Sequence, residues 1–151
     1  MIIDETTTND VAALQRVLQV TDLFPPDLLP DMLSAGTGED AIWLTCRRDE
    51  ADEPIGFLYA VPERLAEGTW NMLAIAVLPE AQNGGAGRCL TEALEKRLRD
   101  RGARILLADT SGLADFEATR TFYRARGYEE EARVRDFWAE GDDKVTFRKA
   151  L

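Results

Sequence analysis

The stretch IAVLPEAQNGGAGR, residues 75–88, decides the fold of this chain. An apolar run leads into a glycine-rich turn, and the turn leads into a helical pattern. This order directs backbone N–H groups and a helix N-terminus toward phosphate oxygens, and Arg88 can add a charge-assisted hydrogen bond. The stretch therefore predicts a pyrophosphate site, although ordinary strand-to-helix turns use similar glycines. The GxGxxG and Gly-Lys-Ser/Thr signatures of other nucleotide-binding loops are missing.

Periodic apolar residues define the elements on both sides of this turn. Residues 69–78 are almost continuously apolar, which predicts a central strand buried on both faces. Residues 88–101 carry Leu90, Leu94 and Leu98 at a spacing of four, which predicts a helix that ends at the following glycine.

The remaining segments also have helical or strand periods. Capping side chains at residues 8–10 precede a first helix, and residues 25–26, both proline, precede a short second helix. The later expected elements are an antiparallel hairpin (41–47 and 55–61), a strand (104–109), a helix (117–126) and two closing strands (128–138 and 144–149). No repeat or linker interrupts this order, so we expect a single domain over residues 1–151.

The charge of the chain is unevenly distributed. The sequence has 28 acidic and 18 basic side chains, a net charge of −10, and residues 1–67 hold the whole negative excess. Nucleic-acid binding depends on Lys and Arg neutralising phosphates, so we expect no nucleic-acid partner. The basic residues of the second half, Arg88 and Arg126 among them, are sufficient locally for a small phosphorylated ligand; alternatively, most of them form a solvated helix face.

Other function classes are disfavoured by what the sequence lacks. No apolar run approaches the roughly 18 to 20 residues that cross a bilayer, so we expect no membrane partner. The N-terminus lacks the basic start and apolar centre of a secretory signal, which favours the cytoplasm. Histidine is absent, and Cys46 and Cys89 have no CxxC spacing, so we expect neither a metal site nor a His-based triad.

Two motifs resemble signatures of the Gcn5-related N-acetyltransferase (GNAT) family. Residues 82–87, QNGGAG, resemble its acetyl-CoA motif, Gln/Arg-x-x-Gly-x-Gly/Ala, and residues 122–128, FYRARGY, resemble aromatic-Tyr-x-x-x-Gly-aromatic. The resemblance covers essentially the whole chain. It implies an α/β (α+β) acyl-CoA N-acyltransferase fold, in which helices flank a mixed central β-sheet that splays open between the strands at 69–78 and 104–109.

The resemblance also implies acetyl-CoA as co-substrate, bound in that opening. Phe116 stands where many relatives have an asparagine that touches the cofactor. Backbone hydrogen bonds to the pantetheine arm are expected from Ile75, Ala76 and Val77. The pyrophosphate is expected at Asn83, Gly84, Gly85, Ala86, Gly87 and Arg88.

Acetyl transfer needs a proton donor for the departing thiolate and an acceptor for the amine proton. Tyr123 matches the general acid of the family; alternatively, it is a core aromatic at helical spacing. Asn71 stands where several relatives carry a glutamate base, and an amide cannot take the proton. Asp109 lines up with an acidic residue of the ribosomal-protein-alanine acetyltransferase branch; alternatively, it caps the turn at residues 110–112.

The resemblance implies an N-acetyltransferase that moves the acetyl group directly to a primary amine of a small molecule or a peptide N-terminus. Because the N-terminal segments carry the negative excess, we expect a cationic acceptor. The alternative function is a non-catalytic acyl-CoA-binding sensor or regulatory module. A transfer toxin acting on charged tRNA is disfavoured by the net charge. The oligomeric state stays open, with a homodimer as one option.

Overall fold

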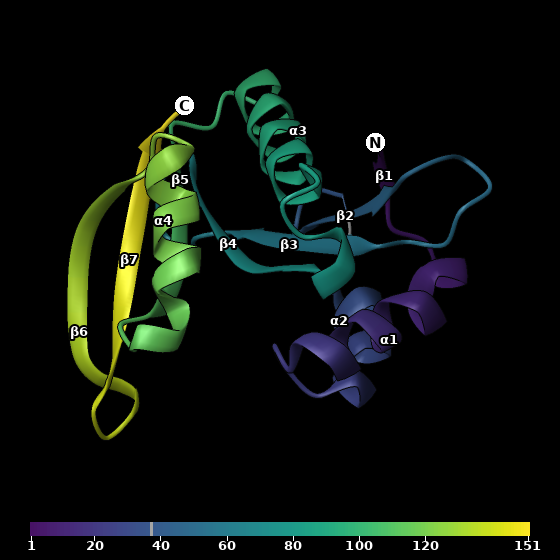
Figure 1. The fold of residues 1–151 in the computed structure, drawn as a ribbon. Coiled ribbons are helices and arrows are strands. Elements are labelled where there is room, and N and C mark those ends of the chain that lie inside the picture. Colours follow the sequence, from purple (N-terminus) through teal and green to yellow (C-terminus); the bar gives the residue numbers. More distant parts are fainter. Residues whose placement is uncertain (37) are drawn as a thin grey trace.

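The computed structural model describes residues 1–36 and 38–151, in which the strands form one seven-stranded sheet of order β1-β2-β3-β4-β5-β7-β6 (Figure 1). The mixed sheet with flanking helices confirms the predicted α/β fold. The strands are β1 (Ile2–Glu5), β2 (Ile42–Arg47), β3 (Gly56–Pro62), β4 (Thr69–Val77), β5 (Ile105–Ser111), β6 (Glu129–Ala139) and β7 (Asp142–Ala150). The helices are α1 (Val11–Thr21), α2 (Leu29–Ala35), α3 (Ala86–Asp100) and α4 (Glu117–Ala125).

Only β1 lacks a counterpart among the predicted elements. It is a four-residue strand that pairs antiparallel with β2 at the edge of the sheet. So short a segment, with apolar side chains only at Ile2 and Ile3, carries too little periodicity to be recognised. Its place in the sheet depends on the partner strand.

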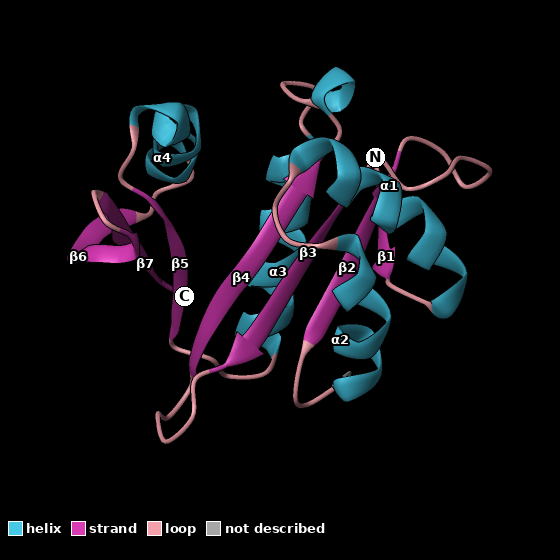
Figure 2. Ribbon diagram, turned by 90° about the horizontal axis from the view of Figure 1, so that it is seen from below, coloured by secondary structure: helices cyan, strands magenta, loops and turns pink. Residues whose placement is uncertain are grey.

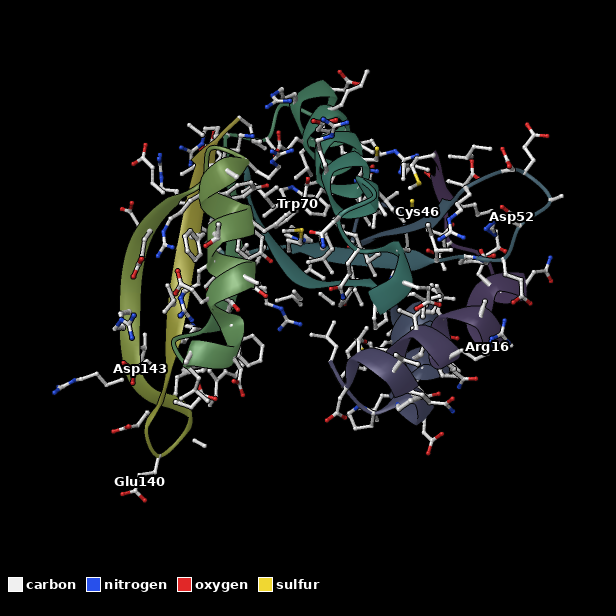
Figure 3. All side chains as sticks on the ribbon, in the orientation of Figure 1. Arg16, Cys46, Asp52, Trp70, Glu140 and Asp143 are labelled. Carbon is white, nitrogen blue, oxygen red and sulfur yellow. The ribbon has the colours of Figure 1, made fainter. Side chains whose placement is uncertain are left out.

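Helices cover both faces of the sheet. The three α3 leucines predicted at a spacing of four are fully buried in one core cluster, which also contains Trp70 (Figure 3). On the opposite face, Leu14 of α1 and Leu29 of α2 are fully buried in a second cluster with Trp43 and Phe57. Among the described residues, no helix is long and apolar enough to span a membrane.

The two central strands are paired over only part of their length. β4 and β5 run parallel, and their register joins Thr69–Met72 to Ile105–Ala108. Beyond this point β5 remains paired with β7, whereas β4 continues alone beside β3. Figure 2 shows β4 and β5 diverging from their common end. This confirms that the sheet opens between the two predicted strands.

A β-bulge marks the position at which β4 leaves its neighbour. The register with β3 shifts there, since Tyr59 faces Ala74 while Ala60 faces Met72, which leaves Leu73 as the extra residue. The prediction that this strand is buried on both faces is wrong at Leu73, whose side chain is 50% exposed. The bulge turns that side chain away from the core, and β5 no longer lies beside it.

A buried carboxylate on α3 holds the C-terminal strand against the helix. Glu95 is 4% exposed, and it accepts hydrogen bonds from the Tyr128 hydroxyl at 3.0 Å and from Lys149 Nζ at 2.8 and 2.9 Å. Arg99 adds an ion pair at 3.2 Å. These contacts join α3 to β7, the partner of β5, so they hold the two sides of the opening together.

We predict that Glu95→Ala lowers the free energy of unfolding by about 3 kcal/mol, because it leaves the Lys149 ammonium without its charge partner. Glu92→Ala is the matched control. Glu92 lies on the same helix with a side chain 63% exposed, so its removal should change stability by less than about 0.5 kcal/mol. Urea unfolding measures both variants, and equal midpoints would contradict the role of Glu95.

Candidate functional site

The divergence of the central strands leaves one backbone edge of β4 without a strand partner. The N–H of Leu78 donates to the carbonyl of Ile55 beside β3, at 2.8 Å. Backbone groups of successive residues face opposite edges of a strand, so those of Val77 and Ile75 face away from β3. Consistent with this direction, the Gln82 amide donates to the Val77 carbonyl at 3.0 Å. This free edge can hydrogen-bond an extended ligand.

A pocket of about 610 Å³ lies beside this edge. Its walls come from the end of β4, from the glycine-rich loop at the start of α3, and from α4. Side chains from these three segments are brought together only by the fold. The lining residues are Ile75, Val77, Gln82, Asn83, Gly84, Gly85, Gly87, Arg88, Ala118, Thr119, Phe122 and Arg126.

The glycine-rich loop ends in a helix start that suits an anion. Gly85 is the N-cap of α3 and has a φ of +91°, a backbone conformation that favours glycine. The first bond of the helix runs from the Cys89 N–H to the Gly85 carbonyl, so the preceding N–H groups have no intrahelical partner. No acidic residue lies in the first turn, and Arg88 and Arg126 both line the pocket. The helix end and two guanidinium groups therefore give this pocket a positive potential.

Most of the residues predicted to bind the cofactor meet in this pocket. The exceptions are two alanines: Ala76 is buried in the cluster beneath α1 and α2, and Ala86 in the cluster beneath α3. By the same alternation of backbone groups along β4, the Ala76 backbone also faces β3 and not the free edge. A contact from the Ala86 backbone stays a prediction. Phe122, Thr119 and Ala118 were missed, because the sequence shows α4 only as an amphipathic helix and not which of its residues border the loop.

Tyr123 lies in α4 with 3% of its surface exposed. Its ring packs against those of Phe122, Tyr128 and Phe147, with centroids 5.3 to 5.6 Å away. Burial raises the pKa of the Tyr123 hydroxyl well above its usual range, and the negative charge of Asp109 raises this pKa further. The hydroxyl therefore stays protonated at neutral pH.

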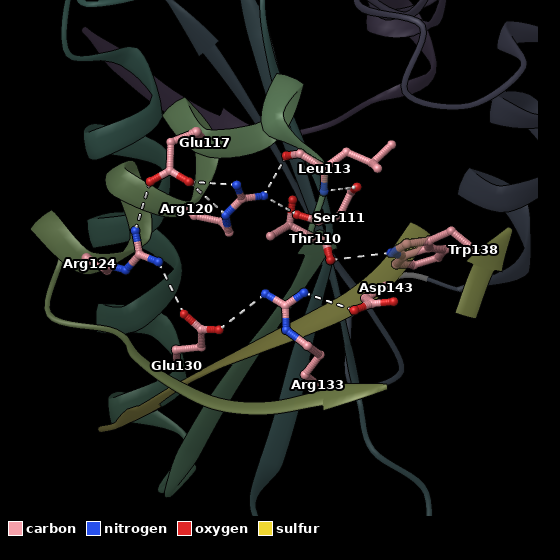
Figure 4. Close-up of polar contacts among 10 residues, drawn as sticks. All are labelled: Thr110, Ser111, Leu113, Glu117, Arg120, Arg124, Glu130, Arg133, Trp138 and Asp143. Atoms are coloured by element: carbon pink, nitrogen blue, oxygen red, sulfur yellow. Dashed lines mark hydrogen bonds and ion pairs between the residues drawn. The ribbon is translucent and has the colours of Figure 1, made fainter. Parts of the chain in front are cut away.

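Arg120, one turn before Tyr123, fixes α4 to the end of β5 (Figure 4). Its Nη1 donates to the carbonyl oxygens of Ser111, at 2.6 Å, and Leu113, at 2.8 Å. The guanidinium also pairs with Glu117 at 2.6 Å, and this hydrogen bond lowers the pKa of the Glu117 carboxyl. Because the Arg120 side chain is almost fully buried, these contacts hold the helix that carries Tyr123 in one position.

Further ion pairs continue from α4 to the last two strands. Arg124 binds Glu130 at 3.1 Å, and Arg133 binds Glu130 at 3.8 Å and Asp143 at 3.0 Å (Figure 4). Hydrogen bonds from the Asp136 backbone N–H and from the Arg133 guanidinium lower the pKa of the Asp143 carboxyl. Trp138 is half-exposed on β6 and donates to a β5 carbonyl. These contacts order the outer strands.

Asp109 is the first β5 residue beyond the pairing with β4. Its carboxylate accepts hydrogen bonds from Thr146 Oγ1 at 2.6 Å and from Asn71 Nδ2 at 3.1 Å. The Leu113 N–H, which follows the turn at residues 110–112, donates to the Ser111 hydroxyl and not to Asp109. The alternative role of Asp109 as a cap of that turn is therefore wrong.

Comparisons with known proteins agree with this geometry. The model of the acetyltransferase (GNAT) domain family matches residues 39–130. A crystal structure of an acetyltransferase assigned to the GNAT family from Desulfovibrio desulfuricans shares 29% identity, with a TM-score of 0.88 over 99% of this chain and 98% of that one. A search of curated proteins finds no match.

Two more distant structures have the same fold. The ribosomal-protein-alanine N-acetyltransferase of Brucella melitensis shares 20% identity, with a TM-score of 0.82 over the full length of both chains. An aminoglycoside 6'-N-acetyltransferase, solved in complex with coenzyme A, shares 19% identity, with a TM-score of 0.82 over 99% of this chain and 97% of that one.

We predict that Tyr123 does not ionise while the protein is folded. An ordinary tyrosine ionises near pH 10, so above this pH the unfolded chain loses the Tyr123 proton while the folded state keeps it. The stability that Tyr123 contributes is therefore complete below about pH 10 and falls as the pH rises further. In an absorbance titration of tyrosinate, wild type and Tyr123→Phe should coincide until the protein unfolds, when wild type gains one extra tyrosinate. A difference near pH 11 in folded protein would show that Tyr123 titrates normally.

Proposed function

The chain belongs to the GNAT acetyltransferase family, and on that premise we propose that it moves an acetyl group from acetyl-CoA directly to a primary amine of a small molecule or a peptide N-terminus. The observation that carries the proposal is the continuity of two features. The free edge of β4 leads directly into the pocket at the start of α3. Acetyl-CoA has the matching chemistry, because its extended pantetheine arm carries amide groups and is joined to a diphosphate.

The co-substrate fits the residues of this chain. The outward-facing backbone groups of Ile75 and Val77 would hydrogen-bond the pantetheine amides as a strand partner does. The N–H groups of Gly87 and Arg88, with the Arg126 guanidinium, would hold the pyrophosphate. One similar structure contains coenzyme A, which supports acetyl-CoA as the donor.

Tyr123 and Asp109 would move the two protons of the reaction. The neutral amine attacks the thioester carbon, the carbon–sulfur bond breaks, and the sulfur receives the Tyr123 proton. Asp109 takes the amine proton, directly or through a water molecule. This assignment is supported by the family signature that Tyr123 matches and by the position of Asp109 where the strands diverge.

The acceptor class rests on charge. The names of two similar structures specify an aminoglycoside and an alanine of a ribosomal protein, so this fold serves small-molecule and protein acceptors alike. The acidic excess of residues 1–67, which include α1 and α2, favours a cation in this chain. A cytoplasmic location and the absence of nucleic-acid, membrane and metal partners stay predictions.

Coenzyme A release in the presence of a panel of amines tests the proposal against the alternative. A transferase releases the thiol only when an acceptor is supplied, whereas an acyl-CoA sensor binds the thioester without turnover. The carboxylate of Asp109 near the opening favours the transferase, even though Asn71 replaces the family glutamate.

We predict that Gly87→Glu weakens acetyl-CoA binding more than about 100-fold, because it places a carboxylate beside the diphosphate. A Cβ at this position would lie 3.4 Å from the Phe122 ring, an ordinary contact, and an acidic residue in the first turn suits a helix. Lys96→Glu, on the exposed side of the same helix, is the control for added negative charge. Calorimetry should show near-normal affinity for the control, and an unchanged dissociation constant in folded Gly87→Glu would refute this placement.

We predict that Tyr123→Phe lowers kcat by about 100-fold to 10,000-fold, because the ring still packs while the proton donor is lost. The value of kcat/KM should fall in parallel, as expected for an interaction made in the transition state. Acetyl-CoA affinity measured by calorimetry is the control and should stay near that of wild type. A variant that keeps more than about half of the turnover, where chemistry limits the rate, would reduce Tyr123 to a core aromatic.

A further inference from the structure

An amide on β4 joins two carboxylates that are distant in the sequence. The Asn71 Nδ2 group donates to Glu63 Oε1 at 3.0 Å and to Asp109 Oδ2 at 3.1 Å. Glu63 follows the end of β3, and its N–H extends the ladder by bonding to the Thr69 carbonyl at 2.8 Å. Both protons of one amide are therefore used to hold two carboxylates close to each other.

These three side chains lie on the face of the sheet opposite the pocket. Asn71 directly precedes Met72 in β4, and Asp109 directly follows Ala108 in β5. Met72 and Ala108 are both buried in the cluster beneath α3. Side chains alternate between the faces of a strand, so the carboxylates share the face covered by α1 and α2. A ligand on this face would approach the strand opening from the side opposite the α3 loop.

The group is rich in hydrogen-bond acceptors and lacks a cation. Within residues 1–36 and 38–151, neither Glu63 nor Asp109 has a lysine or arginine at ion-pair distance. Asn71 is 5% exposed, and its Oδ1 atom is buried without a hydrogen-bond donor in the same part of the chain. A buried acceptor without a donor is unfavourable, so this atom points to a ligand that donates.

We infer that Glu63, Asn71 and Asp109 form a subsite for a protonated amino group of the acceptor, and that Glu63 selects cationic acceptors. An alkylammonium group carries three N–H donors, and the subsite offers two carboxylates and one amide oxygen. Glu63 is a specificity residue here and not part of the proton transfer assigned to Asp109. The inference rests on the proposed function in one respect: the ammonium belongs to the molecule that is acetylated.

The binding test uses 1,4-diaminobutane as the probe and protein saturated with coenzyme A. Calorimetry should show binding of the diamine to wild type, and Glu63→Gln should weaken it by about 10-fold to 100-fold, since the variant keeps the shape but loses the charge. Glu63→Asp should restore most of the affinity. Glu67→Gln, an exposed carboxylate of the same turn, is the matched control and should bind as wild type does.

The probes also separate two sources of the ammonium. If the subsite holds the reacting amine, Glu63→Gln weakens 4-aminobutan-1-ol and 1,4-diaminobutane alike; if it holds a second amine, only the diamine is affected. For any amine that is acetylated, Glu63→Gln should raise KM, while kcat stays within about twofold of the wild-type value. The affinity for acetyl-CoA should not change. A general structural defect would instead lower kcat and acetyl-CoA affinity as well.

The inference is overturned if 1,4-diaminobutane binds wild type no better than 1,4-butanediol does, or if folded Glu63→Gln binds it as tightly as wild type. Failure of the proposed function gives a different result. In that case no amine of the panel releases coenzyme A, while the diamine still binds in a manner that depends on Glu63. Conversely, if every acetylated amine has the same KM in Glu63→Gln as in wild type, the transferase stays intact and the subsite is removed.

Discussion

The short pairing between β4 and β5 is the constraint on which the rest of the structure depends. Parallel strands normally share a continuous ladder, and here the ladder stops at Met72 and Ala108. The β-bulge at Leu73 lies directly after the last paired residue of β4, and β5 stays paired with β7 along its other edge. An unpaired edge next to the core would be a liability in most sheets, because its N–H and C=O groups need partners. In this chain the edge opens into a pocket whose ligand can supply them.

The two sides of the opening are held by different kinds of contact. On the α3 side, apolar burial dominates, and the buried carboxylate of Glu95 reaches across to Lys149 of β7 and to the Tyr128 hydroxyl. On the α4 side, Arg120 bonds to backbone carbonyls at the end of β5. Directional hydrogen bonds from a buried guanidinium fix orientation better than apolar contacts do. That precision suits the role of proton donor that we propose for Tyr123 on this helix.

The structure gives Asn71 a role that the sequence does not indicate. In the sequence, Asn71 stands where several relatives of the family have a glutamate, and the loss of that carboxylate would suit a protein that binds acyl-CoA without catalysis. In the fold its amide holds Glu63 and Asp109 on one face of the sheet. Two carboxylates, one directly after β3 and one on β5, thus lie beside Asn71. A residue-by-residue comparison with the family therefore underestimates the acidic character of this site.

The amino-acid sequence by itself determined the order of the elements and the glycine-rich loop, because periodicity, capping and a positive φ at Gly85 are local properties of the chain. It also placed Tyr123 through a short signature. Only the tertiary structure decided that Ala76 and Ala86 turn away from the pocket and that Arg126 lines it. The edge strand β1, the bulge, and the meeting of residues 63, 71 and 109 depend on strand register. These features arise where strands from distant parts of the sequence pair, and the period of one strand alone specifies neither its partner nor the position of a bulge.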